Sequence, residues 1–285
     1  MVALVTPFRD GEVDWAALDR LVDRQIEGGT DWLVPCGTTG ESPTLTHDEH
    51  DRVIEAVIAR SAGRRPVLAG TGSNATPEAI RLTQHAREAG ADAALLVAPY
   101  YNRPTQEGMF RHFAAIAEAV DMPLMLYNVP FRTGIEIKPE TVARLRQAFP
   151  HYVAIKHATG SVDGASEIAN LCDIDILSGD DSMTLPLMAV GAVGVVSVLA
   201  NLLPGEVKAL VDAASRGDYD RARALHRKQF ALFSAMSALG PNPLPIKTAL
   251  ALQGHMADGF RLPLCSLSDE QRETLARLLK KHECL

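Results

Sequence analysis

The stretch DAALLVAPYY, residues 92–101, is apolar without interruption from Ala93 to Pro99. A strand with one face in water alternates apolar and polar residues, whereas a parallel strand covered by helices on both faces is apolar throughout. The stretch therefore predicts a buried strand of a parallel sheet.

Seven further runs of this kind occur at fairly even intervals, and each is followed by a stretch with helical periodicity. They are VALVTPF (2–8), DWLVPCG (31–37), PVLAGTG (66–72), PLMLYNVP (123–130), YVAIKHATG (152–160), DILSGDD (175–181) and VGVVSVLAN (193–201). Eight strand–helix units of this size predict an α/β fold of the (β/α)8 TIM-barrel class over residues 1–213. A doubly wound open sheet is the alternative, but it would usually show fewer strands or a break in the spacing.

Residues typical of helix starts and helix ends occur between these runs. Thr46 and Glu49 form a capping-box pair, and Pro77 after Thr76 predicts a proline at the first helical position. Glycines stand where three helices are expected to end: Gly28, Gly63 and Gly90.

Beyond Asp212 the strand pattern stops and three helical stretches follow, at 218–239, 243–256 and 268–281. The last opens with Ser268 and Gln271 in capping-box spacing. The connecting LLPGEV (202–207) is too short and apolar for a flexible linker. Residues 214–285 are therefore predicted to form a C-terminal helical extension packed on the barrel, rather than an independent domain.

Composition excludes several classes of protein. The chain has 285 residues, 47% hydrophobic and 22% charged, which is ordinary for a globular protein. Its net charge of −7 argues against nucleic-acid binding, and no apolar stretch approaches the ~20 residues of a membrane span. The four cysteines follow no CxxC or metal-binding spacing, which predicts reduced thiols and a cytoplasmic location.

Polar side chains gather at the expected strand ends, where barrel enzymes carry their active sites. These ends hold Thr6, GTTGES (37–42), GTGSN (70–74), YYN (100–102), YNVPFRTG (127–134), Lys156, SGDD (178–181) and Ser197. Taken alone, a glycine-rich turn is more often only a turn. Likewise His47 and His50 in HDEH lie on one helical face, but without a third ligand they favour an ordinary polar surface over a metal site.

Lys156 is a charge inside an apolar run. Either the strand has ended and the amine has reached water, or the amine is a buried nucleophile. Burial lowers the pKa of an amine, as a Schiff-base nucleophile requires. If Lys156 points to the mouth of the barrel, His157 points to the helices and is structural. The residues alone leave both interpretations of Lys156 open.

Several motifs together carry a family resemblance. GTTGES, YYNRP (100–104), YNVPFRTG, IKHATG (155–160) and SGDD, in this order, resemble the dihydrodipicolinate synthase family of pyruvate-dependent class I aldolase-like barrels. The resemblance covers essentially the whole chain, including NPLPIK (242–247). It implies a lyase that condenses pyruvate with L-aspartate 4-semialdehyde in the diaminopimelate route to L-lysine, without a metal or an organic cofactor.

The resemblance also assigns site residues. Lys156 is expected to form the Schiff base with pyruvate, and Tyr127 to shuttle protons through a hydroxyl relay with Thr39 and Tyr101. Arg132 is expected to bind the carboxylate of the semialdehyde, because its guanidinium can do so bidentately. The remaining substrate-binding residues, which hold the pyruvate carboxylate or line the pyruvate site, are expected to be Thr38, Thr39, Gly179 and Val196.

Assembly and regulation are implied in the same way. The family resemblance predicts a homotetramer, a dimer of dimers, in which Tyr101 reaches the site of the partner subunit. It also predicts an L-lysine effector site, where Glu78 would hold the ammonium group. HDEH is then interpreted as part of this effector site rather than as an ordinary polar surface. The expected effector residues are Ser42, Leu45, His47, His50, Asn74, Glu78 and Tyr100.

Two alternatives remain at this stage. N-acetylneuraminate lyases and 2-keto-3-deoxy acid aldolases would use Lys156 and Tyr127 equally, but Arg132 and the Tyr100–Tyr101 doublet favour the synthase. A non-catalytic barrel that binds a keto acid would have no use for a proton relay. Phe131 is bulkier than the residue often found beside this arginine, and we expect it to narrow the pocket for the second substrate.

Overall fold

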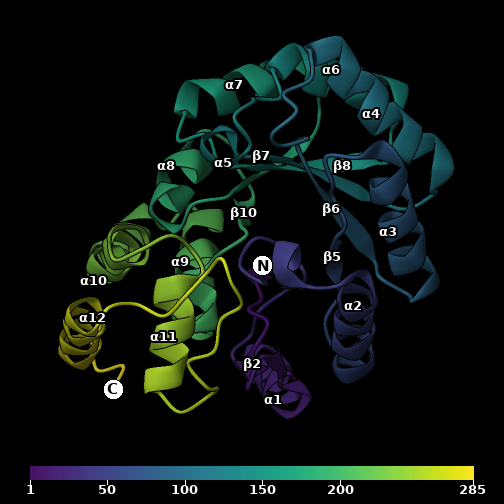
Figure 1. Ribbon diagram of the computed structural model, residues 1–285. Helices are drawn as coiled ribbons and strands as arrows, with labels where there is room; N and C mark the ends of the chain where they lie inside the picture. The colour runs from purple at the N-terminus through teal and green to yellow at the C-terminus, as the bar shows by residue number, and fades with distance from the viewer. The chain divides into compact units, whose positions relative to one another are not determined.

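The computed structural model describes residues 1–285 and contains two compact units, each described here by itself. One unit comprises residues 67–196, and the other joins residues 1–66 to residues 197–285. Strands and helices alternate along the chain, and the strands at all eight predicted positions pair in parallel, which confirms the α/β class (Figure 1). The predicted domain boundary at residue 213 stays a prediction.

The 67–196 unit contains a six-stranded parallel sheet whose strand order follows the chain. Its strands are β5 (Leu68–Gly70), β6 (Ala93–Val97), β7 (Leu124–Asn128), β8 (Tyr152–His157), β9 (Asp175–Ser178) and β10 (Gly194–Val195). Because neighbouring strands run in the same direction, their carboxyl ends all meet at one edge of the sheet.

The helices of this unit are α3 (Thr76–Glu88), α4 (Gln106–Ala119), α5 (Pro130–Thr133), α6 (Pro139–Ala148), α7 (Val162–Leu171), η2 (Asp181–Met183) and α8 (Thr184–Ala189). Figure 1 shows α3, α4, α6 and α7 on one side of the sheet. Apolar side chains fill the space between: Phe113 and Tyr152 are fully buried, with ring centroids 6.2 Å apart. The Tyr152 hydroxyl donates to the Phe113 carbonyl over 2.8 Å, so the buried phenol is satisfied.

In the unit of residues 1–66 and 197–285, β1 (Val2–Ala3) pairs in parallel with β4 (Leu33–Val34). An antiparallel hairpin of β2 (Phe8–Arg9) and β3 (Glu12–Val13) was not among the predicted elements. Its turn is Asp10–Gly11, where both residues have positive φ, 52° and 84°. Asp-Gly is a strong hairpin signal, so the sequence did contain the information.

The helices of this second unit are α1 (Trp15–Glu27), η1 (Ser42–Thr44), α2 (His47–Ser61), η3 (Leu199–Asn201), α9 (Pro204–Ser215), α10 (Tyr219–Ala238), α11 (Leu244–Leu252) and α12 (Asp269–Lys281). Helices α10, α11 and α12 occupy the three predicted C-terminal stretches. Helix α10 packs against α9, α11 and α12.

The predicted helix starts are largely confirmed. Both capping boxes are present, Thr46 with Glu49 on α2 and Ser268 with Gln271 on α12. Helix α3 begins one residue earlier than predicted, so its proline, Pro77, is the second helical residue.

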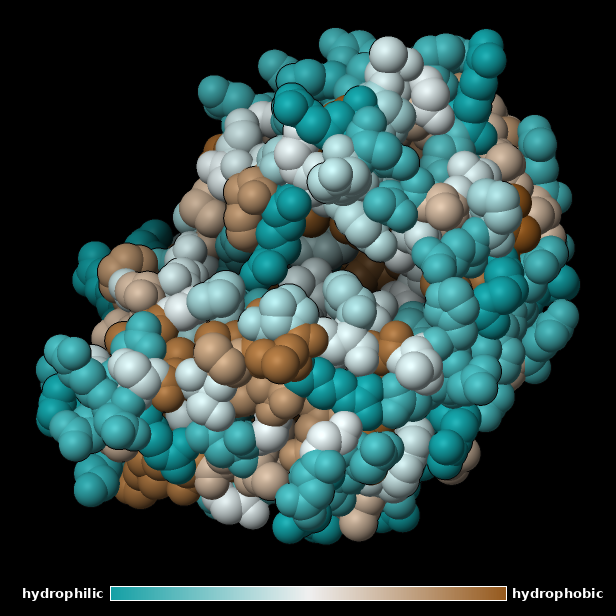
Figure 2. Space-filling view, viewed as in Figure 1, coloured by the Kyte–Doolittle hydropathy of each residue, from teal (hydrophilic) through white to brown (hydrophobic).

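The surface seen in Figure 2 is mostly hydrophilic, with smaller apolar groups between the polar residues. All four cysteines are free. None of the helices combines the length and apolar character needed to cross a bilayer.

Candidate active site

Lys156 lies within β8 and is only 5% exposed. The structure therefore rules out the alternative in which the strand has ended and the amine is in water. His157 is on the opposite face, where its Nε2 contacts the Thr159 hydroxyl at 2.7 Å and the Ser161 carbonyl at 2.9 Å. His157 thus supports the turn into α7, as predicted for a structural residue.

Tyr127 is the register partner of Lys156 on the neighbouring strand β7. Paired residues of adjacent parallel strands project from the same face, so the two side chains lie together. Lys156 Nζ is 4.2 Å from the centroid of the Tyr127 ring, and Tyr127 is 6% exposed. The buried amine therefore lies over the aromatic ring of Tyr127.

Gly179 and Val196 follow β9 and β10. A Cβ on Gly179 would lie 2.4 Å from Ala158 Cβ and 3.2 Å from Lys156 Cε, so only glycine fits beside the lysine. Val196 is fully buried, and its N–H donates to the Ser178 carbonyl over 2.9 Å. The Gly179 position therefore borders the amine directly.

Asp180 is a residue of this region that received no role from the sequence. Burial raises the pKa of its carboxyl, while the positive charge of Lys156 acts in the opposite direction. Asp180 is therefore an acidic neighbour of Lys156, brought there by the pairing of β9 with β8. Its only sequence signal was its place in SGDD.

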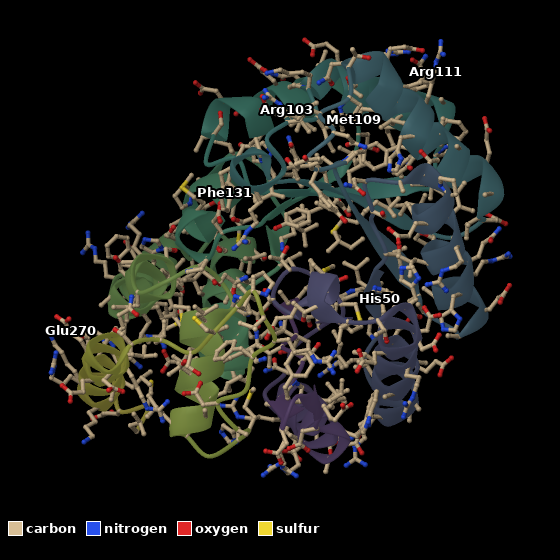
Figure 3. The ribbon with its side chains drawn as sticks, in the orientation of Figure 1. His50, Arg103, Met109, Arg111, Phe131 and Glu270 are labelled. Carbon is tan, nitrogen blue, oxygen red and sulfur yellow. The ribbon has the colours of Figure 1, made fainter.

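Arg132 lies on α5, a helix of one turn that directly follows β7. Its side chain is exposed, and its guanidinium carbon is 5.4 Å from the centroid of the Phe131 ring. Phe131 itself is 71% exposed (Figure 3). The bulky phenylalanine therefore stands at the surface next to the arginine.

Tyr101 is 90% exposed and has a positive φ of 70°, a conformation that costs energy in a residue with a side chain. Its N–H donates to the Thr133 carbonyl over 3.4 Å. Asn74 Nδ2 donates to the Tyr100 carbonyl over 3.2 Å, and Asn102 Nδ2 donates to the Asn74 carbonyl over 2.9 Å. The loop thus holds its backbone firmly while presenting the Tyr101 phenol to the exterior.

Thr38 and Thr39 belong to a tight turn in the other unit. The N–H groups of Gly40 and Glu41 donate back to the carbonyls of Gly37 and Thr38, both over 3.1 Å. Thr39 is 2% exposed, and its Oγ1 accepts a hydrogen bond of 3.0 Å from Asn242 Nδ2. A residue of the NPLPIK segment thus fixes the Thr39 hydroxyl.

Glu41 and Lys247 form an ion pair whose side chains are both fully buried. Neither residue was assigned a role from the sequence. Lys247 Nζ lies 4.4 Å from the centroid of the Phe8 ring. Burial lowers the pKa of the Lys247 amine to about 8, against the opposing effect of the Glu41 carboxylate. Glu41 has a positive φ of 53°, so the pair anchors a strained residue two positions after Thr39.

The expected effector residues fall into two groups, one in each unit. Asn74, Tyr100 and Glu78 lie in the 67–196 unit, where the Ser73 hydroxyl donates to the Glu78 carboxylate. In the other unit, His50 is 4% exposed on α2 (Figure 3), whereas His47 is exposed. Ser42 and Leu45 are joined by a hydrogen bond of 3.2 Å from the Leu45 N–H to the Ser42 carbonyl. No group of three or more His, Cys, Asp or Glu side chains is arranged to hold a metal ion.

Comparison with known proteins now identifies the family. The model of the dihydrodipicolinate synthetase family matches residues 1–282. The chain belongs to this family. The 4-hydroxy-tetrahydrodipicolinate synthase of Pelobacter propionicus is 56% identical over 284 residues, which cover 99% of this chain and 97% of the relative.

Solved structures of dihydrodipicolinate synthases agree with this assignment. The chloride-inhibited enzyme of Acinetobacter baumannii in complex with pyruvate has a TM-score of 0.97 and 45% identity, covering 100% of this chain and 98% of that one. The enzyme of Cyanidioschyzon merolae with lysine bound has a TM-score of 0.96 and 38% identity, covering 100% and 97%. The fold of this dihydrodipicolinate synthetase family member is therefore matched along its whole length.

Proposed function

We propose that this protein is a 4-hydroxy-tetrahydrodipicolinate synthase that condenses pyruvate with L-aspartate 4-semialdehyde. The observation that carries the proposal is the contact between the buried Lys156 amine and Tyr127 on adjacent strands. The names of relatives above 50% identity support the same activity. A role in the diaminopimelate route to L-lysine supports the predicted cytoplasmic location.

The reaction would begin when Lys156 Nζ attacks C2 of pyruvate and the carbonyl oxygen leaves as water, which forms a Schiff base. Loss of a proton from C3 gives an enamine, which attacks the aldehyde carbon of the second substrate. Tyr127, next to the amine, would supply the proton that converts the aldehyde oxygen into a hydroxyl. The amine of the second substrate then attacks C2, displaces Lys156 and closes the ring, so the lysine is regenerated.

Other residues would bind the substrates. The Thr38–Thr39 turn presents backbone N–H groups suited to the pyruvate carboxylate. Gly179 leaves space beside the amine because a Cβ there would meet Ala158 and Lys156. Arg132 would bind the carboxylate of the semialdehyde bidentately. We infer these roles, with Val196 lining the pyruvate site, from the family resemblance together with this geometry.

We also propose that the eight strands close into a (β/α)8 barrel. The parallel order from β5 to β10 supports closure, as does the pairing of β1 with β4. On its other side β1 forms a bridge from Val2 to Ser197, a residue just after β10. The Leu33 N–H likewise donates to the carbonyl of Pro66, two residues before β5.

A homotetramer, built as a dimer of dimers, forms part of the proposal. Tyr101 is 90% exposed in a strained conformation, which supports a phenol that completes the hydroxyl relay of a partner subunit. Mixing a Lys156→Ala variant with a Tyr101→Phe variant should then restore activity, because some mixed dimers contain one intact site. Equal inactivity of the mixture and its components would argue against sharing.

We further propose that L-lysine inhibits the enzyme. Glu78, already accepting a hydrogen bond from Ser73, offers a carboxylate for an ammonium group, and the lysine-bound relative supports such a site. Millimolar L-lysine should lower turnover of the natural chain, and Glu78→Gln should weaken that inhibition. Unchanged activity at millimolar lysine would remove this part of the proposal.

Borohydride trapping tests the central step. Reduction in the presence of pyruvate should attach it irreversibly to Lys156, as located by peptide mass analysis, and Lys156→Met should abolish the adduct. Turnover with pyruvate plus L-aspartate 4-semialdehyde then identifies the synthase. No adduct would refute every Schiff-base mechanism, whereas an adduct without condensation would indicate another pyruvate aldolase or lyase.

A further inference from the structure

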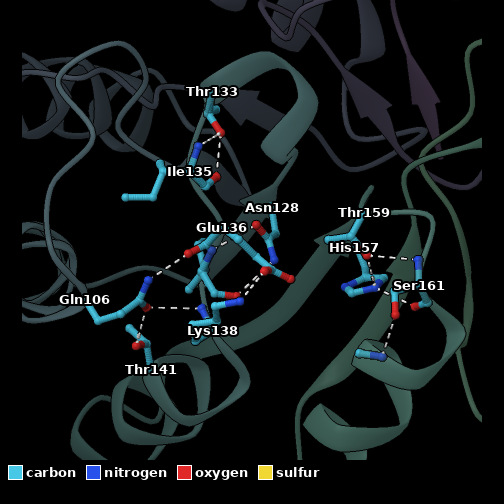
Figure 4. Close-up of polar contacts among 12 residues, drawn as sticks. Gln106, Asn128, Thr133, Ile135, Glu136, Lys138, Thr141, His157, Thr159 and Ser161 are labelled. Atoms are coloured by element: carbon cyan, nitrogen blue, oxygen red, sulfur yellow. Dashed lines mark hydrogen bonds and ion pairs between the residues drawn. The ribbon is translucent and has the colours of Figure 1, made fainter.

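Two side-chain amides hold the loop of residues 134–138, which follows the helix that carries Arg132 (Figure 4). Asn128, the last residue of β7, makes a matched pair of bonds with Ile137. Its Nδ2 donates to the Ile137 carbonyl and its Oδ1 accepts from the Ile137 N–H, both over 3.0 Å. Asn128 is 1% exposed, so this pair fixes the loop to the end of a buried strand.

Gln106, the first residue of α4, also forms hydrogen bonds with the backbone of this loop. Its Nε2 donates to the Glu136 carbonyl over 2.8 Å, and its Oε1 accepts from the Lys138 N–H over 3.1 Å. The Thr141 hydroxyl donates to the same Oε1 over 2.6 Å. Both ends of the amide are therefore used: the Glu136 carbonyl and the Lys138 N–H fix which end faces which backbone group, and the Thr141 hydroxyl adds a third bond.

The position of Arg132 depends on this loop. Helix α5 has four residues, and a single helical turn is not stable without external contacts. Its end is tied to the loop by Thr133, whose hydroxyl donates to the Ile135 carbonyl over 2.7 Å. The Thr133 carbonyl also accepts the bond from the Tyr101 N–H. The loop therefore helps to set the position of the short helix that carries Arg132.

We propose that Gln106 is a positioning residue for recognition of the second substrate. It fixes the 134–138 loop, together with Asn128, so that Arg132 is presented to the carboxylate of an anionic aldehyde. This inference rests on the proposed function and adds to it a residue that does not touch substrate. Lys156 and Tyr127 lie within strands and do not depend on the loop, so the pyruvate half of the reaction is independent of Gln106.

Gln106→Ala is the informative variant, because Gln106 is partly exposed and its loss leaves the loop backbone accessible to water. We expect KM for L-aspartate 4-semialdehyde to rise about 5–10-fold, since a loosened loop presents Arg132 in only part of its conformations. KM for pyruvate and the rate of borohydride trapping on Lys156 should stay within about twofold.

Two further variants serve as a control and as a weaker perturbation of the same support. Gln84→Ala removes an exposed glutamine from α3 and should change neither KM. Thr141→Val preserves volume but removes the hydroxyl bonded to Gln106 Oε1, and it should raise KM for the aldehyde by a smaller factor in the same direction.

A second background separates positioning from general structural damage. In an Arg132→Ala protein, adding Gln106→Ala should raise KM for the aldehyde no further, because both changes remove the same interaction. A Gln106→Ala effect of equal size on both substrates, or one that persists in full without Arg132, would overturn the inference. Absence of condensation by the natural chain would instead overturn the proposed function.

Discussion

Replacing Gly179 by alanine should disturb the candidate active site directly, because the added methyl group would lie beside Lys156. The new Cβ would stand 2.4 Å from Ala158 Cβ, 3.1 Å from Ala158 Cα and 3.2 Å from Lys156 Cε. Neither Ala158 atom can rotate away. The Gly179 N–H also donates to the His157 carbonyl over 2.9 Å, so the backbone is held on that side.

The size of the effect follows from these distances. Carbon atoms pack best at about 3.5–4.0 Å, so relief of the clash requires a backbone shift of about 1 Å. Overpacking of this kind costs about 1–3 kcal/mol, and the upper end applies because the neighbour is rigid. A displacement of about 1 Å at the reacting amine can also slow the chemistry by about a hundredfold.

Urea unfolding and the rate of borohydride trapping with pyruvate measure the two effects separately. Gly205→Ala is the matched control: its new Cβ would lie 3.7 Å from the Gly28 carbonyl oxygen, an ordinary contact, and alanine favours the α9 helix. We expect that control to be neutral or slightly stabilising. A Gly179→Ala protein with natural stability and an unchanged trapping rate would refute the reasoning.

Three further predictions concern stability. Lys247→Met leaves the Glu41 carboxylate buried without its ion-pair partner, so it should lower the free energy of unfolding in urea by about 3–5 kcal/mol. Burial lowers the pKa of His112 from 6.5 to about 4, so between these values the unfolded chain binds a proton that the folded chain does not. The stability from this histidine should be complete above pH 6.5 and fall by about 3 kcal/mol as the pH drops towards 4. His112→Gln should remove this pH dependence from unfolding curves. The Arg261 guanidinium lowers the pKa of Glu49 from 4.5 to about 2, so the stability from this pair is present above pH 4.5 and lost as the pH falls through 2. Solvent screening limits that loss to about 1–2 kcal/mol, and Glu49→Gln should show a correspondingly flatter acid limb in thermal melts.

The strands could be predicted because a buried parallel strand is marked by a continuous apolar run within its own sequence. Each of the eight apolar runs contains a strand, although several strands span only two or three residues of the run. The capping boxes at Thr46 and Ser268 were visible for the same reason, since both partners lie within one turn. The hairpin at Asp10–Gly11 was equally local, and it was missed because Phe8–Arg9 and Glu12–Val13 each contain a charged residue and so form no apolar run.

The surroundings of Lys156 could not be predicted in the same way. Its burial depends on strand pairing, and its neighbour Tyr127 lies on a different strand. The acidic neighbour, Asp180, follows β9 and is close only because β9 pairs with β8. The family resemblance supplied Tyr127 as a partner, but the role of each residue stays a prediction until an adduct is measured.

The polar supports of the candidate site were the least visible in the sequence, because they join side chains to backbone groups or to distant side chains. Glu41 and Lys247 are 206 positions apart, and each would be costly to bury without the other. Asn128 and Gln106 reach carbonyl and N–H groups, which every residue possesses and no motif marks. Residues that touch substrate can be found from motifs at strand ends, whereas residues that hold those strand ends in place require the fold. Variants of the second kind should therefore separate substrate affinity from chemistry, and Gln106→Ala offers that separation without altering a residue assigned to the reaction.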